Sequence, residues 1–147
     1  MGSADTGTDT TGASLGPVLV RAIGAAVLGA GIWIGLAGPF GVTWGLLAVA
    51  LFIGWLVGSA TRGATPAPRM TTRRAVAVGG ALFAWLLALA GVYLYSLATL
   101  PSFGPAGSSL GERIAATPIT TFYAQQFGPL DVVDVALLVL AAWWTSR

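Results

Sequence analysis

The sequence predicts an all-α integral membrane protein with four transmembrane helices, and three observations lead to that prediction. The 147 residues are 56% hydrophobic and only 8% charged, with a mean hydropathy of +0.83. Soluble domains carry about 25% charged residues, so this composition is typical of a membrane protein. The other two observations are four apolar runs of nearly spanning length and an uneven distribution of arginine along the chain.

The four apolar runs are close to the length of about 20 residues that a membrane-spanning helix needs. They place the predicted helices at residues 17–38, 41–61, 74–98 and 129–146. Only a few residues around Pro39 separate the first two runs, which favours a tight antiparallel hairpin. We therefore expect a single transmembrane domain over residues 17–147.

Residues 1–16, which precede the first run, are small, polar and slightly acidic. Such a segment cannot form a core, so we expect a disordered cytoplasmic tail. A secretory signal peptide begins with positive charge, and these residues have none. Arg21 leaves a signal-anchor helix open as an alternative.

Arginine supplies all the basic charge and predicts the topology. Four of the seven basic residues lie between the second and third runs: Arg62, Arg69, Arg73 and Arg74. By the positive-inside rule this connection is cytoplasmic. The topology is then N-in and C-in, with a long outer connection over residues 99–128 before the last helix. We expect a short interfacial helix in its second half, with Phe122, Tyr123 and Phe127 at headgroup depth.

The residue types that are missing exclude most catalytic chemistry. The sequence has no Cys, His or Lys, so disulfides, Cys/His zinc or haem ligation and Schiff-base chemistry are ruled out. It contains no phosphate-binding loop, nucleophile elbow or dinucleotide fingerprint. The arginines form no aromatic-interleaved patch for nucleic acid. We expect no enzyme and no cofactor, and the six tryptophans mostly fit interface belts.

Two aspartates near the start of the last run form the centre of a candidate intramembrane polar site. Asp131 and Asp134 are three residues apart, so they share one face of the predicted helix. A span of about 30 Å has to include Asp134, because the apolar stretch after it is short. Asp131 follows Pro129 and is interpreted as a helix-start residue. Asp134 either bonds to neighbours inside the bundle or serves as a proton or cation site.

Other polar side chains are expected at a similar depth. Tyr93, Tyr95 and Ser96 end the third run, and Thr43, Gln125 and Gln126 flank the second and fourth runs. Carboxylate and hydroxyl oxygens together suit a hard cation. Tyr and Ser at helix ends are also ordinary interface anchors, so both interpretations stay open.

Glycines spaced four apart form a second pattern, at Gly31 and Gly35, Gly41 and Gly45, and Gly54 and Gly58. Small residues at this spacing let helix backbones approach closely in lipid. The pattern predicts a tightly packed hairpin of the first two helices, or docking onto a partner protein.

Two stretches, GIWIGLAGPFGVTWGLLAVALFIGWLVGSATRGA and GPLDVVDVALLVLAAWWTSR, resemble small uncharacterised bacterial membrane proteins with four helices. The resemblance implies a fold and carries no activity. Arginine as the sole base, with much Ala and Gly, points to a bacterial inner membrane. Four-helix small multidrug transporters are similar in size but carry a glutamate in the first helix, and residues 17–38 hold none.

The functional expectation is a non-catalytic accessory or structural subunit that packs in a larger membrane complex. Its expected partners are the lipid bilayer and other membrane chains or a second copy of itself. The alternative is a homo-oligomeric transporter or channel, with Asp134 as the coupling site and Asp131 as its helper.

Overall fold

The computed structural model describes residues 15–40, 45–64, 69–104 and 107–147, and every regular element in these ranges is a helix. The elements are α1 (Gly16–Ala37), α2 (Leu46–Arg62), α3 (Met70–Thr99), a short 3-10 helix η1 (Pro101–Phe103), α4 (Leu110–Ala116), α5 (Ile119–Gln126) and α6 (Pro129–Thr145). The all-α prediction is confirmed for this part of the chain.

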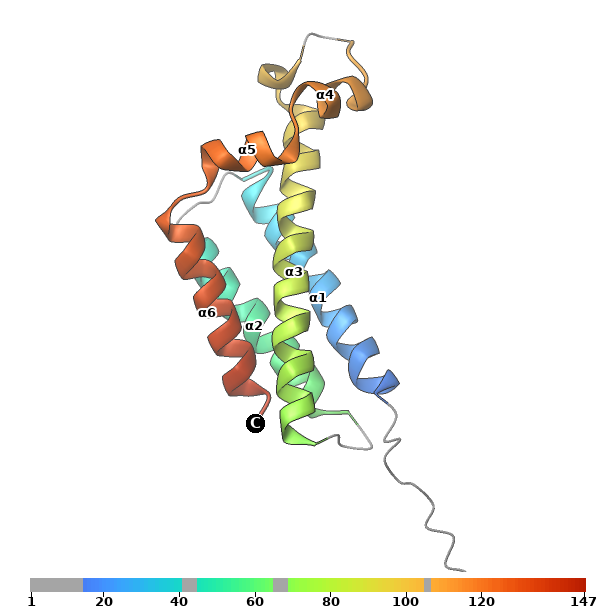
Figure 1. Ribbon diagram of the computed structural model, residues 1–147, viewed down its shortest axis with the longest axis vertical. Helices are drawn as coiled ribbons and strands as arrows, with labels where there is room; N and C mark the ends of the chain where they lie inside the picture. The colour runs from blue at the N-terminus through green and yellow to red at the C-terminus, as the bar shows by residue number, and fades with distance from the viewer. Residues whose placement is uncertain (1–14, 41–44, 65–68, 105–106) are drawn as a thin grey trace, which may run out of the picture.

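The four long helices form an elongated bundle in which successive long helices run in opposite directions (Figure 1). The helix α3, with 30 residues, extends beyond the others at the end where α4 lies. The helix α5 crosses the same end above α6 (Figure 1). We call this the outer end, and we call the end where α1 and α3 begin and α2 and α6 finish the basic end.

The observed helices α1 and α6 match their predicted bounds to within one residue. By contrast, α3 begins at Met70, before the predicted start at residue 74. Hydropathy could not mark this start, because a helix needs apolar residues only where it contacts lipid. The helix α2 begins at Leu46; residues 41–44 of the predicted span lie outside the described residues, as do residues 1–14 of the predicted tail.

Two helices, α1 and α3, are long and apolar enough to cross a membrane by length and composition. The pair α5 and α6 reaches that threshold only as one span, bent by 104°. The helix α2 is apolar but shorter, with 17 residues. Among the described residues two or three helices therefore meet this criterion, where the sequence predicted four spans.

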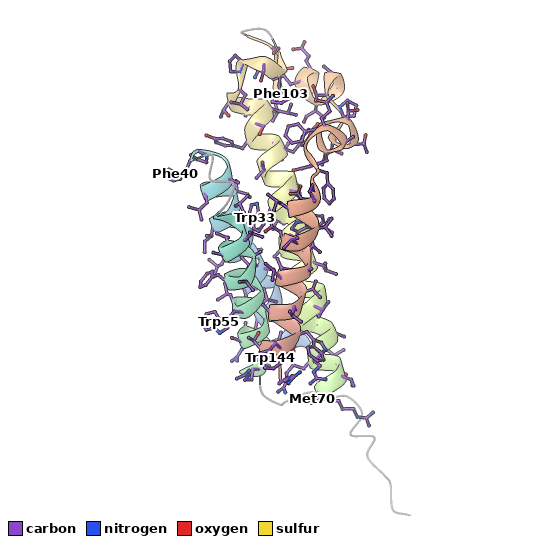
Figure 2. The ribbon with its side chains drawn as sticks, turned by 90° about the vertical axis from the view of Figure 1, so that its left-hand side faces the viewer. Trp33, Phe40, Trp55, Met70, Phe103 and Trp144 are labelled. Carbon is purple, nitrogen blue, oxygen red and sulfur yellow. The ribbon has the colours of Figure 1, made fainter. Side chains whose placement is uncertain are left out.

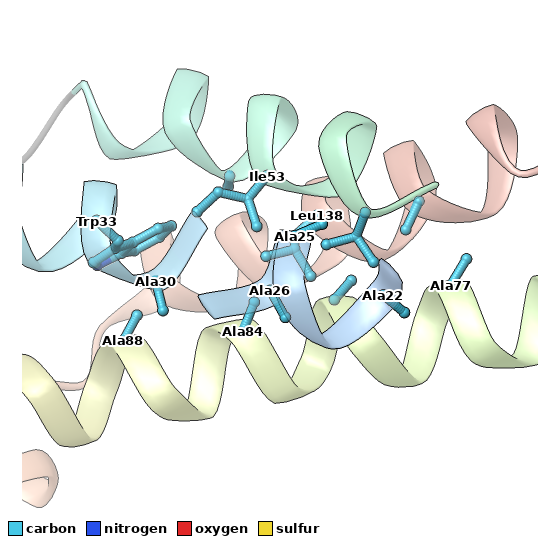
Figure 3. Packing of buried hydrophobic residues seen from close by; sticks show 14 residues of the cluster. Ala22, Ala25, Ala26, Ala30, Trp33, Ile53, Ala77, Ala84, Ala88 and Leu138 are labelled. Carbon is cyan, nitrogen blue, oxygen red and sulfur yellow. The ribbon is translucent and has the colours of Figure 1, made fainter. Parts of the chain in front are cut away.

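Small side chains fill the main core. Of its fourteen buried residues ten are alanine, so the helix backbones lie close together. Figure 3 shows Ala22, Ala26 and Ala30 of α1 facing the alanine row of α3. Many large apolar side chains are exposed instead: Phe40 and Trp55 point outward in Figure 2, and Leu28 is 65% exposed. This distribution is consistent with a protein surrounded by lipid, where small residues bring helices together.

The closest helix contact joins α2 to α6 rather than α2 to α1. A Cβ atom at Gly54 would lie 2.8 Å from the Cβ of Ala141, and one at Gly58 would lie 2.7 Å from the carbonyl oxygen of Ala142. Real Cβ atoms do not approach carbonyl oxygens so closely, so these two positions accept only glycine without a shift. This parallel pair is held by the Gly-xxx-Gly spacing of α2.

The other predicted glycine pairs have different surroundings. No atom lies within 4 Å of a Cβ placed at Gly31 or Gly35, so these residues pack against nothing in the described chain. Gly45 is the N-cap of α2, and Gly41 lies outside the described residues. The tight α1 contact instead uses Gly29, whose Cβ would meet the side chain of Ile53 at 2.8 Å.

The outer connection folds into η1, α4 and α5 rather than one interfacial helix. Thr117 is the C-cap of α4 and Pro118 is the N-cap of α5, and the helix breaks here because proline disfavours helical geometry in the residue before it. Phe122 is 3% exposed and packs edge-to-face on Tyr93 at 5.3 Å, so its ring is covered by protein, and its position at headgroup depth stays a prediction. Phe127 is 48% exposed and has the exposure that the interfacial prediction requires.

Candidate intramembrane polar site

Asp131 acts at the start of α6. Its Oδ2 accepts a hydrogen bond of 2.7 Å from the backbone N–H of Gly128, and Pro129 occupies the first turn. The carboxylate also lies near the positive end of the helix dipole. These contacts are those of a helix-start residue. The sequence suggested this role for Asp131, with a helper role in a transporter as the alternative.

Asp134 lies one turn deeper and faces the bundle. It is 5% exposed, and its buried Oδ1 accepts no hydrogen bond from any described residue. The next residue on the same face is Leu138, which is fully buried against Gly54 of α2. A buried acceptor without a donor is costly in apolar surroundings, so Asp134 is the polar group that the fold of this chain explains least.

The tyrosines and serine predicted to surround Asp134 have other partners. The hydroxyl of Tyr93 donates to the carbonyl oxygen of Thr117 at 2.7 Å. The ring of Tyr95 covers Gly38, where a Cβ would lie 2.8 Å from the ring. Ser96 is buried, and its carbonyl accepts from the N–H of Leu100. Within the described residues no hydrogen bond joins any of the three to Asp134.

Tyr123 is a neighbour of Asp131 that was not among the predicted site residues. It lies on α5, within electrostatic range of Asp131, and its hydroxyl donates to the carbonyl of Leu89. Its position depends on the bend between α5 and α6, for which the sequence offers no local signal except Gly128 and Pro129. Gln125 is exposed, whereas Thr43 and the side chain of Gln126 lie outside the described part of the chain.

Metal ligands are sparse around the two carboxylates. Across the described ranges no three Asp, Glu, His or Cys side chains lie close enough to hold one ion. A hard cation takes six or more oxygen ligands. Any oxygen ligands beyond the two carboxylates would therefore have to come from hydroxyl or carbonyl groups.

The outer end holds a small cavity of about 390 Å³ between η1 and α4, lined by Phe103, Gly104, Ser108, Glu112, Arg113 and Ala116. The guanidinium group of Arg113 donates to Ser108 Oγ at 2.9 Å and to the carbonyl of Leu97 at 2.8 Å. Glu112 accepts from the N–H of Ser109, and this bond lowers the pKa of the carboxyl group. Arg113 and Glu112, the charged side chains that line this cavity, thus form hydrogen bonds within the protein.

The basic end gathers six of the seven arginines, at the start of α1 and α3 and at the finish of α2 and α6. Figure 2 places Met70 and Trp144 together at this end. Arg21 donates to the carbonyl of Gly63, and Arg62 donates to the carbonyl of Thr145. The bond of Arg21 thus ties α1 to the end of α2.

No family model, curated protein or solved structure matches the chain. The resemblance to small bacterial membrane proteins therefore stays a prediction.

Proposed function

We propose that the chain is a multi-pass protein of a bacterial inner membrane, with α1, α2, α3 and α6 as its four spans and both ends in the cytoplasm. Two features support this topology. The four helices alternate in direction, and six arginines gather at one end. The 17 residues of α2 and of α6 are at the lower limit of the range of about 17–25 residues that spans a bilayer.

We further propose that the protein is a non-catalytic accessory or structural subunit of a larger membrane complex. The observation that supports this role is the open glycine pair on α1. Gly31 and Gly35 are four residues apart with nothing within 4 Å of either Cβ position, and the neighbouring Leu28 and Ile32 are exposed. Lipid gains little from contact with these two glycines, whereas a helix of another chain can approach them closely.

A pull-down of the tagged full-length chain in mild detergent, followed by native mass spectrometry, tests this role. We expect larger chains at fixed stoichiometry with the unchanged protein, and their loss with the double substitution Gly31→Leu and Gly35→Leu. Gly79→Leu is the matched control, because Gly79 of α3 is also helical and open. Recovery of the chain alone, or of the same partners with all variants, would contradict the proposal.

The second candidate is a homo-oligomeric transporter or channel, and the buried, unpartnered carboxyl group of Asp134 favours it. Proton flux into proteoliposomes, measured with a pH-sensitive dye, tests this role. The transporter requires a defined homo-oligomer whose flux is lost in Asp134→Asn while the oligomer stays intact. If Asp134→Asn changes neither flux nor assembly, the residue has no role in either proposed function.

A further inference from the structure

The basic end carries positive charge that no described acidic side chain balances. The acidic side chains in the described ranges are Glu112 of α4 and the two aspartates in the outer half of α6. Arginines that lie within a Debye length of about 10 Å repel one another unless an anion lies among them. The partners of each arginine therefore indicate where an anion binds.

The fold uses two of these arginines at helix ends. Arg21 and Arg62 donate to the carbonyl oxygens of Gly63 and Thr145, just past α2 and at the last residue of α6. Positive charge at a helix C-terminus is favourable, because free carbonyl groups point there. These two guanidinium groups have structural positions that do not require a ligand.

Arg74 and Arg147 are different, because one tryptophan ring brings them together. The guanidinium carbon of Arg74 lies 4.7 Å from the ring centroid of Trp143, and that of Arg147 lies 4.6 Å from the same centroid. Arg147 also lies 4.1 Å from the ring of Trp144. Each contact is a favourable cation–π interaction, yet together they place two like charges against one ring.

The same place has hydrogen-bond donors without acceptors. The Nε atoms of Arg73 and Arg74 are buried and donate to no atom of the described residues. The N-cap residue of α3 is Arg69, whose side chain makes no capping hydrogen bond to the N–H groups of the first turn. Two close cations beside exposed tryptophans favour an anion that also has apolar parts.

We infer that Arg74, Arg147, Trp143 and Trp144 bind the phosphate group of an anionic phospholipid; we call these four residues the Arg–Trp site. Guanidinium groups match phosphate oxygens in pairs, and tryptophan rings settle at headgroup depth. Basic pockets between helices bind such headgroups. The inference rests on the membrane placement proposed above and is independent of the accessory role.

The surface beside the Arg–Trp site fits the rest of a lipid. Leu140 lies one turn before Trp144 on the same face of α6 and is 58% exposed. A phospholipid whose phosphate reaches the Arg–Trp site therefore has an apolar path for its acyl chains along α6. Free phosphate would use only the arginines and would gain nothing from this path.

Lipid titration of the full chain in a mild non-ionic detergent, read by native mass spectrometry, tests the inference. The probes are phosphatidylglycerol, phosphatidylcholine and inorganic phosphate. We expect phosphatidylglycerol to bind with a Kd about tenfold lower than that of phosphatidylcholine. Its headgroup carries a net negative charge, and arginines near the headgroup attract that charge. The double substitution Arg74→Gln and Arg147→Gln should remove this preference.

Arg69→Gln is the matched control. It removes one positive charge from the same end, where the double substitution removes two, and the Arg69 side chain is exposed with no hydrogen bond to the described residues. We expect Arg69→Gln to keep most of the preference for phosphatidylglycerol. An equal loss in this control would show that overall charge, not the Arg–Trp site, attracts the lipid and would overturn the inference.

Two further measurements keep the result clear. Competition by inorganic phosphate would indicate a free-anion site, and equal binding of both lipids to the unchanged protein would show no headgroup recognition; either result would overturn the inference.

If the double Gln variant fails to fold, Arg74→Lys alone replaces it, since lysine keeps the charge but loses the paired donors. Weaker phosphatidylglycerol binding by that variant is expected, and unchanged binding contradicts the site. The isolated chain is used throughout, so a failed pull-down of partners does not affect this test.

Discussion

At the scale of single residues, Gly54 and Gly58 determine how closely α2 and α6 approach. Gly54→Ala would push a methyl group against Ala141 and the backbone at Leu138. We expect a loss of stability of about 1–3 kcal/mol, the usual cost of overpacking a close contact. Unfolding in micelles by titration with sodium dodecyl sulfate, followed by circular dichroism, measures this change.

Gly31→Ala is the control for that experiment. The site is open, and alanine favours a helix over glycine by about 1 kcal/mol, so stability should be unchanged or higher. If Gly54→Ala and Gly31→Ala unfold at the same detergent fraction, the close approach of α2 and α6 is wrong.

Glu112 gives α4 a pH dependence. Hydrogen bonds from the backbone and side chain of Ser109 hold the pKa of Glu112 below its ordinary value of 4.5. The stabilisation is therefore fully present above the unfolded-state pKa and is lost as the pH falls through the lower folded-state value. We expect the amide resonances of α4 to show loss of helix in that acidic range, and Glu112→Gln to remove the transition. An identical pH profile in Glu112→Gln would exclude this capping role.

The two aspartates show which roles of single residues can be predicted from the sequence and which cannot. The role of Asp131 is local, since Pro129 and the following apolar run already mark a helix start. The surroundings of Asp134 depend on how α3 is rotated about its axis. A helix that is apolar on nearly all faces does not fix that rotation, so the sequence could not show that Tyr93 and Tyr95 have other partners.

At the scale of elements, Tyr93 attaches the outer connection to α3. Tyr93→Phe removes the hydrogen bond to the carbonyl of Thr117, and we expect a local loss of about 1 kcal/mol. Hydrogen exchange followed by mass spectrometry should then show faster exchange in peptides from residues 107–118. Tyr95→Phe is the matched control, because the hydroxyl of Tyr95 makes no hydrogen bond within the described residues. Equal exchange in the two variants would contradict the role of Tyr93.

The long helices were predictable and the outer connection was less so, for a physical reason. Contact with apolar surroundings requires long apolar runs, and such runs are visible in any window of the sequence. The helices α4 and α5 depend on a capping box at Ser109 and a break at Pro118, which are signals of one or two residues. The partner of α2 was not predictable, because glycine spacing marks a close contact without naming the helix across it.

At the scale of the whole molecule, the proposed topology can be tested with single cysteines, since the sequence has none of its own. Thr71→Cys lies at the basic end and Ser102→Cys at the outer end, and both positions are exposed. In intact spheroplasts we expect a membrane-impermeant maleimide to label Ser102→Cys only. After lysis both should react. Labelling of Thr71→Cys alone before lysis would invert the topology, and labelling of both would rule out the four-span arrangement.

The unequal lengths of the helices have a consequence for the membrane itself. At 1.5 Å per residue, the 17 residues of α2 and of α6 measure roughly 26 Å, while the 22 residues of α1 measure roughly 33 Å. The two short helices pack directly on each other, so one flank of the protein is shorter than a hydrocarbon layer of about 30 Å. In the proposed four-span arrangement, lipids along that flank would have to compress, at a cost of fractions of a kcal/mol for each ångström of mismatch. Two proteins that thin the bilayer in this way lower the total cost by sharing one thinned region, so in that arrangement the short flank would attract similar neighbours before any side chains meet.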